Sequence, residues 1–144
     1  MSRIKLKMPQ HYLFSTHVDI RITDINYGNH LGNDSLLSII HEARLHFLKS
    51  MGYSEFDVEG VATIMGDVAI IYKSQAYYGD KLKIDIGVAD LAKKSCDIYY
   101  RVTKDANKIV ALCKTGVVFY DYQNSKPVNI PQAFIEKVNQ QSAY

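Results

Sequence analysis

The sequence predicts an α+β domain in which one long helix lies across an antiparallel sheet. Residues 33–50 repeat apolar side chains at helical spacing, whereas most segments after Val61 alternate or run apolar as strands do. Short turns rich in Gly, Asp, Asn and Lys separate these later segments. One strand, one long helix and then several antiparallel strands is the element order of a helix packed on one face of a sheet.

The first element is a strand over Thr16–Ile22. Val18, Ile20 and Ile22 alternate with polar side chains, so they share one face of an extended segment. We expect that face to point into the core.

The central helix begins near residue 33 and runs for about five turns. Gly32 or Asn33 serves as the N-cap, and Asp34 suits the free amides and the positive dipole end of the first turn. Gly52 supplies the residue after the helix, where a left-handed conformation is common. The stripe expected to face the core consists of Leu36, Ile40, Ala43 and Phe47.

Four further strands and a short helix follow, which brings the predicted sheet to five strands. Turns at residues 78–80, 92–95 and 105–107 have lengths that suit hairpins. Pro127 ends the sheet, and the last helix covers Gln132–Gln140. The four strands are predicted at residues 61–76, 81–91, 96–104 and 108–122.

Length and composition restrict the class of protein. The 144 residues form one domain, residues 1–144, and the net charge of +2 without a Lys/Arg cluster argues against a nucleic-acid partner. Residues 1–10 lack the apolar core of a signal peptide, and no stretch reaches the roughly 18 apolar residues of a membrane span. We therefore expect a cytoplasmic protein without membrane insertion. Cys96 and Cys113 lack metal-type spacing, which indicates free buried thiols.

The second predicted strand is unusually apolar. Met65, Val68, Ile70 and Ile71 place apolar side chains on both of its faces. An exposed strand edge of this kind pairs with another chain. The sequence therefore predicts a homodimer joined through residues 62–76.

The loop at residues 24–31 is the first candidate for chemistry. It places Asp24, Asn26, Tyr27 and His30 directly ahead of the N-terminus of the helix. The free backbone N–H groups of a helix N-terminus bind anions or polarise a carbonyl oxygen. A polar connection that only caps the helix is the alternative interpretation.

Four short segments, in the same order along the chain, carry a resemblance to a known family. The run DINYGNHLGN at residues 24–33 resembles the family loop Asp-x-Asp-x-x-Gly-His-Val-Asn-Asn, and residues 41–44 (HEAR) resemble the Glu-Ala-Arg of its helix. Residues 78–80 resemble its Gly-Asp turn, and residues 128–131 resemble its strand exit. The family is that of the hotdog-fold thioesterases of the 4-hydroxybenzoyl-CoA thioesterase type. The resemblance implies a five-stranded antiparallel sheet wrapped around one long central helix.

The resemblance also implies an activity. Members of this family are hydrolases that cleave an acyl-CoA or acyl-carrier-protein thioester to a free acid and a thiol. They share their sites between two subunits of a homodimer, which in some cases assembles into a homotetramer. No metal site and no cofactor is expected, apart from the coenzyme A moiety of the substrate. The alternative is a non-catalytic hotdog dimer that binds acyl-CoA or a related ligand.

The chain departs from the family pattern at one position. Family members place a catalytic carboxylate in the loop, 17 positions before the alanine of Glu-Ala-Arg, and that position counted from Ala43 is Asn26. An asparagine can hold a water or bind the thioester oxygen, but it cannot accept the proton that a general base takes. Asp24 takes over the catalytic role only if the loop shifts by two positions, and stabilisation of the loop is its other interpretation.

His30 matches a histidine found in part of the family, and an imidazole suits proton transfer at neutral pH. Glu42 is the second candidate for the base, because some family members carry their carboxylate on the helix. A loop histidine bonded to backbone, and a Glu42 paired with Arg44 or His46, are the structural alternatives. The substrate-binding residues are predicted to be Tyr27, Gly32 and Asn33.

Overall fold

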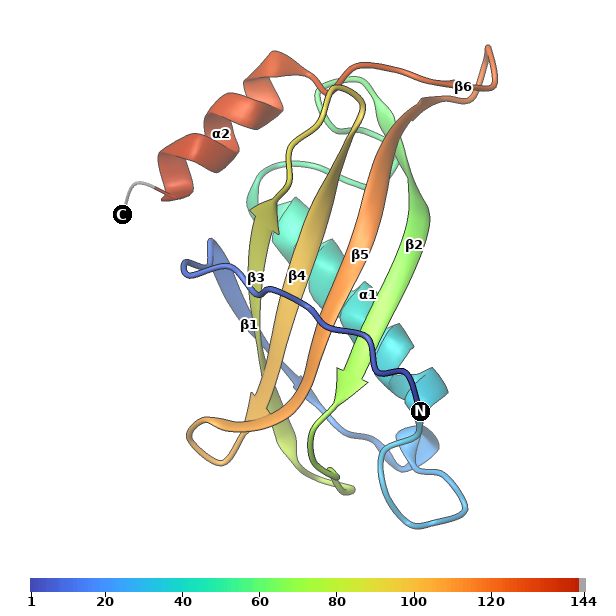
Figure 1. The fold of residues 1–144 in the computed structure, drawn as a ribbon, viewed down its shortest axis with the longest axis vertical. Helices are drawn as coiled ribbons and strands as arrows, with labels where there is room; N and C mark the ends of the chain where they lie inside the picture. Colours follow the sequence, from blue (N-terminus) through green and yellow to red (C-terminus); the bar gives the residue numbers. More distant parts are fainter. Residues whose placement is uncertain (143–144) are drawn as a thin grey trace.

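The computed structural model describes residues 1–142 of the chain. In it, α1 (Asn33–Ser50) crosses one face of an antiparallel sheet (Figure 1). This arrangement confirms the predicted α+β class and the central helix. From one edge to the other, the sheet consists of β1 (Phe14–Asp19), β3 (Lys81–Ala89), β4 (Ser95–Lys104), β5 (Lys108–Asp121) and β2 (Ala62–Tyr72).

The core lies between α1 and the sheet face that it covers. Ile84 of β3 stands opposite Val102 of β4, and Tyr100 of β4 stands opposite Cys113 of β5. All four side chains are fully buried, because alternate residues of a strand point to the same face. The helix contributes the predicted stripe, which is at most 1% exposed: Leu36, Ile40, Ala43 and Phe47.

Both ends of α1 form as predicted. Gly32 is the N-cap residue, and Gly52 follows the helix in a left-handed conformation with φ of +82°. A second helix, α2 (Gln132–Ser142), packs at one end of the sheet. The ring of Phe134 lies 5.4 Å from that of Phe119 and 6.2 Å from that of Tyr53.

The prediction for the first strand is wrong at both ends. β1 covers Phe14–Asp19, and Ile22 is 67% exposed in a 3₁₀ turn, η1 (Ile22–Asp24). The Asp24 carboxylate accepts a hydrogen bond from the Arg21 N–H at 2.8 Å, and this local bond turns the chain out of the sheet. The alternation of apolar and polar residues, on which the prediction rested, does not indicate such a hydrogen bond.

The second strand ends at Tyr72, four residues before its predicted end at Ala76. The N–H groups of Lys73 and Ser74 both donate to the Val110 carbonyl, at 2.8 and 3.2 Å, so the ladder stops there. The segment released from the sheet becomes a wall of the cavity described below.

A sixth strand, β6 (Lys126–Pro127), adds to the five that were predicted. It pairs with the end of β5, where Pro127 stands opposite Tyr120. Pro127 is the last residue of the last strand, so the sheet ends there as predicted, and the next residue, Val128, donates its N–H to the Phe119 carbonyl at 2.9 Å. The remaining boundaries differ from the prediction by at most two residues.

Residues 1–13 cross the face of the sheet opposite α1 (Figure 1). Pro9 packs so closely on Gly87 of β3 that an added Cβ would lie 3.0 Å from the proline ring. The Arg101 guanidinium lies 5.0 Å from the centre of the Tyr12 ring. These contacts involve β3 and β4, and β2 remains an edge strand of the sheet.

Two further sequence predictions concern burial and the membrane. Cys96 and Cys113 are free, buried thiols as predicted, and burial raises the pKa of each to about 12. Among residues 1–142, neither helix has the length and apolar character required to span a membrane.

Candidate active site

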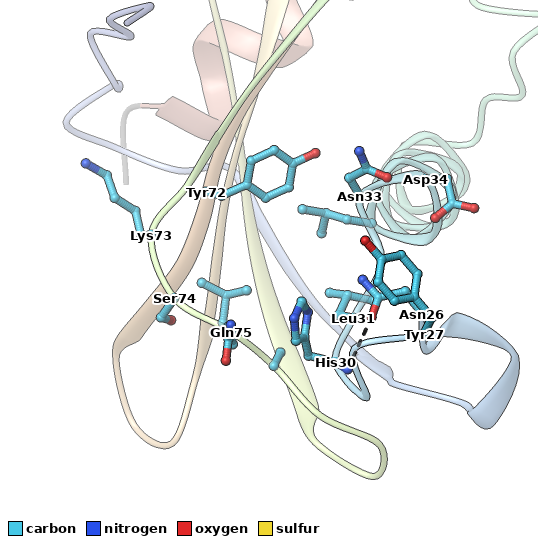
Figure 2. A pocket seen from close by; sticks show the side chains of 14 residues that line it. Asn26, Tyr27, His30, Leu31, Asn33, Asp34, Tyr72, Lys73, Ser74 and Gln75 are labelled. Atoms are coloured by element: carbon cyan, nitrogen blue, oxygen red, sulfur yellow. Dashed lines mark hydrogen bonds between the residues drawn. The ribbon is translucent and has the colours of Figure 1, made fainter. Parts of the chain in front are cut away.

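An open cavity of about 930 Å³ lies between the start of α1 and the end of β2. The loop before α1 forms one side of it, and the residues that follow β2 form the other (Figure 2). Its lining includes five of the seven predicted site residues, namely Asn26, Tyr27, His30, Gly32 and Asn33.

Asn26 gives the loop its shape. Its Oδ1 accepts hydrogen bonds from the N–H groups of Gly28, at 2.9 Å, and of His30, at 3.5 Å. Its own N–H donates to the His30 carbonyl at 2.9 Å, and Asn29 between them takes a left-handed φ of +65°. These bonds occupy the side-chain oxygen of Asn26 and leave its NH₂ group as a donor for a ligand.

The His30 ring is half-buried and points into the cavity, between Gln75 on one side and Asn26 on the other (Figure 2). It rests on Gly28, where an added Cβ would lie 3.1 Å from Nε2. The described residues include two histidine–carboxylate pairs, His41 with Glu55 and His46 with Glu42, and His30 belongs to neither. Its ring is therefore not oriented by a carboxylate within residues 1–142.

The first turn of α1 supplies free amides and one carboxylate. The Leu36 N–H is bonded to the Gly32 carbonyl at 3.0 Å, which leaves the N–H groups of the residues between them without a helical acceptor. Asp34 folds back toward Gly32, since an added Cβ there would lie 2.7 Å from Asp34 Oδ1. The cavity thus contains a carboxylate that was not among the predicted site residues. The sequence feature that could have indicated Asp34 is that it is an acidic residue in the first turn of the helix.

The sequence analysis also missed the cavity wall formed by the end of β2 and the segment after it, residues 72–76, because these residues were predicted to lie within a strand. Partial burial, with the nearby Cys113 and Asp34, raises the pKa of Tyr72, so its phenol stays protonated and can donate at neutral pH. Lys73 carries an exposed ammonium group at the rim. Gln75 Oε1 accepts a bond from the Tyr77 hydroxyl at 3.0 Å, which leaves the Gln75 NH₂ group as a further donor.

The other two predicted site residues, Asp24 and Glu42, lie away from the cavity. The Asp24 carboxylate is 5% exposed and bonds to the N–H and guanidinium of Arg21. Glu42 lies 3.0 Å from Nε2 of His46, whose Nδ1 is 2.8 Å from Thr16 Oγ1. Both carboxylates line a different hollow, between α1 and β1, of about 580 Å³.

A polar network lies at a third hollow, of about 550 Å³, between α1 and the first half of β2. Glu55 is 2.9 Å from Nε2 of His41 and 3.3 Å from the guanidinium of Arg44. Arg44 also donates to the Tyr100 hydroxyl at 3.3 Å, which is 2.8 Å from Thr115 Oγ1. Burial raises the pKa of Tyr100, against the opposing effect of Arg44.

This third hollow and the cavity lie along one seam between α1 and β2. Tyr72 borders the cavity and Val68 borders the hollow, and residues four apart in a strand face the same side. On the helix, Asn33 borders the cavity and Leu37, one turn later, borders the hollow. Leu37 and Val68 make the middle of the seam apolar, and the Glu55 network lies at its far end.

The described part of the chain contains no cluster of side chains suited to bind a metal ion. Within residues 1–142, no group of three or more His, Cys, Asp and Glu side chains is placed to hold a metal ion.

The sheet order, the central helix and the cavity at its N-terminus define a hotdog-fold protein. A model of the thioesterase-like superfamily matches residues 20–138. The chain belongs to this superfamily, which confirms the resemblance seen in its motifs.

Solved structures with the same fold include proteins named as thioesterases. A 1,4-dihydroxy-2-naphthoyl-CoA thioesterase from Synechocystis superimposes with a TM-score of 0.79 at 17% identity, over 88% of this chain and 95% of that one. A putative thioesterase from Pseudomonas aeruginosa gives 0.81 at 13%, over 89% and 99%. A hypothetical protein from Staphylococcus aureus in complex with CoA gives 0.81 at 14%, over 96% and 89%. Identities this low show a shared fold. No curated protein matches the chain.

Proposed function

We propose that the protein hydrolyses an acyl-CoA thioester in the cavity between α1 and β2. The observation that carries the proposal is that the His30 imidazole, the NH₂ group of Asn26 and the free amides of α1 all border one cavity. Negative charge develops on the thioester oxygen as water attacks the carbonyl carbon, and such donors stabilise it. His30 accepts the proton of the attacking water, the C–S bond breaks, and the CoA thiolate takes up a proton.

Asp34 is the second candidate for the base. It carries the carboxylate that the loop lacks at Asn26, and it borders the same cavity as His30. Glu42 is a weaker candidate, because it borders the hollow on the β1 side of the helix and pairs with His46. Asp24 is bonded to Arg21, and we assign it to the support of the loop.

The proposal places the acyl group in the seam. From Asn33 to His41 the helix rises about 12 Å, which accommodates an acyl chain of roughly eight to ten carbons. A longer apolar chain would meet the Glu55 ion pair, whose charges are costly to desolvate. Lys73 at the rim suits the phosphates of coenzyme A or of a carrier-protein prosthetic group.

A homodimer is part of the proposal. β2 is an edge strand, and two of its side chains beside the seam, Met65 and Val68, are 36% and 45% exposed. Pairing of β2 with its counterpart in a second copy would satisfy the free strand edge and shield these side chains.

The second candidate function is binding of acyl-CoA without hydrolysis. Two observations favour it: Asn26 replaces the carboxylate of the family loop, and His30 has no carboxylate partner among residues 1–142. An imidazole without an orienting partner is a less effective base.

A thiol-release assay separates the two functions. Purified protein is given acyl-CoAs from acetyl to long-chain and aromatic, and an acyl-carrier protein, with and without a chelator. The buried Cys96 and Cys113, with pKa values of about 12, contribute little background. We expect turnover that is insensitive to chelator and falls about 100-fold in His30→Gln but not in the control His17→Gln. Saturable binding of acyl-CoA without turnover of any substrate would establish the binding function instead.

A further inference from the structure

Lys104, at the end of β4, is a buried lysine with three partners. Its side chain is 6% exposed, and its Nζ donates to the Gln75 carbonyl at 2.8 Å and to Asp80 Oδ2 at 3.2 Å. The ammonium group also lies 4.8 Å from the centre of the Tyr77 ring. A charge is kept out of water only where such partners replace its hydration. All three partners belong to the segment that joins β2 to β3.

The same segment forms the wall of the cavity and holds the loop before α1. Gln75 and Ala76 both line the cavity, and the Ala76 carbonyl accepts the Leu31 N–H at 2.8 Å. Leu31 follows His30 directly and pairs with Ile25 in an isolated β-bridge. The wall and the loop are therefore joined at one hydrogen bond, next to the proposed base.

We infer that Lys104 is a positioning residue for the cavity. It holds the Gln75 carbonyl, which fixes the wall, and the wall fixes the His30 loop through Ala76 and Leu31. The effect on catalysis rests on the proposed function, whereas the effect on the loop does not. Lys104 does not line the cavity, so it acts on the reaction only through these residues.

The wall needs this support because it has left the sheet. β2 ends at Tyr72, and the Gln75 carbonyl has Lys104 Nζ as its donor instead of a strand neighbour. Removal of the ammonium group leaves the bond that the Tyr77 N–H donates to Asp80 Oδ2 at 2.9 Å, but it removes the bond to the Gln75 carbonyl. A displacement of about 1 Å among catalytic groups is enough to lower a rate by about 100-fold.

The first test compares Lys104→Met with a matched control, Lys114→Met. Lys114 lies on the neighbouring β5, is 15% exposed and pairs with Asp67 at 2.7 Å, but it does not line the cavity. Both variants remove a paired ammonium group, and both are expected to lower Tm. We expect kcat/KM to fall at least 10-fold in Lys104→Met, mainly through kcat, and to stay within 2-fold in Lys114→Met. Lys104→Arg, which keeps the charge, should recover part of the loss.

The second test measures hydrogen exchange of the Leu31 amide and needs no activity. We expect exchange to be at least 10-fold faster in Lys104→Met than in wild type, and unchanged in Lys114→Met. If wild type turns over no thioester while this difference holds, the proposed function fails and the positioning role stands. If folded Lys104→Met keeps the exchange rate of wild type, the inference is wrong. Lys104→Gln takes the place of the methionine variant if that variant does not fold.

Discussion

Asn26 shapes the loop through the same atoms that an aspartate would offer. Its Oδ1 accepts bonds from the Gly28 and His30 amides, and a carboxylate oxygen accepts such bonds equally well. Asn26 stands where the family has a carboxylate, and it therefore keeps the hydrogen bonds that give the loop its geometry. What changes is the ability to accept a proton.

Asn26→Asp is accordingly expected to fold like wild type and to retain activity. Wild-type kcat/KM should fall on acidification, because an imidazole acts as a base only in its neutral form. An ordinary carboxylate stays ionised at a pH where imidazole is already protonated, so the acid limb of the variant should move to lower pH. The measurement is kcat/KM from pH 4.5 to 8.5. An unmoved acid limb in an active variant would show that residue 26 takes no proton.

Asp80 gives a prediction on stability. The Tyr77 N–H and the nearby Lys104 hold the pKa of the Asp80 carboxyl below its ordinary value of 3.8. A depressed folded-state pKa contributes stability that is complete above the unfolded value and is lost as pH falls through the folded value. Asp80→Asn should therefore lower the urea midpoint at pH 7, and the gap to wild type should narrow below about pH 3.8. A gap of constant size across this range would contradict the assignment.

At the scale of the element, β2 bends at a bulge between Met65 and Asp67. The bulge brings the Asp67 carboxylate over Gly116 of β5, where it accepts the Gly116 N–H at 2.9 Å and the Lys114 ammonium at 2.7 Å. A Cβ on Gly116 would collide with that carboxylate. The Asp67 side chain thus occupies the space that a Cβ at residue 116 would take.

Gly116→Ala should lower the free energy of unfolding by about 1 kcal/mol, the low end of the overpacking range, because the exposed Asp67 carboxylate moves aside and loses its bond to the Gly116 N–H. The cost should be smaller in an Asp67→Ala background, because the group that meets the new methyl is then absent. Urea unfolding of the two single variants and the double variant measures this coupling. Equal losses in both backgrounds would show that Asp67 is not the cause.

At the scale of the whole molecule, the two edges of the sheet differ. β1 forms one edge and β2 forms the other, and β2 presents the exposed Met65 and Val68 beside the seam. We predict that wild type sediments as a dimer at micromolar concentration and that Val68→Glu shifts it toward monomer. Ile22→Glu is the control, since Ile22 is 67% exposed and lies in the 3₁₀ turn that follows β1, the other edge strand of the sheet. If the sedimentation mass of the wild-type protein equals that of one chain, the dimer proposal is wrong.

The sequence by itself determined the order of the two helices and the five long strands, the buried stripe of α1 and the resemblance to hotdog thioesterases. These features are local. The periodic spacing of apolar residues that indicates a helix or a strand lies within one segment, and each family motif spans a few neighbouring residues. The wrong boundaries at Ile22 and after Tyr72 arose where hydrogen bonds ended a strand: one to the Asp24 carboxylate, and two that share the Val110 carbonyl. Such bonds leave no periodic pattern.

Only the tertiary structure decided which residues meet. Asp34 and Glu42 are both acidic residues of α1, but they lie eight positions, or about 12 Å, apart along the helix axis, so they border different hollows. Lysine side chains are mostly exposed in folded proteins, yet the segment after β2 folds over Lys104 and leaves it 6% exposed. A cavity is a property of several segments packed together, and its membership depends on distances that a one-dimensional pattern does not contain.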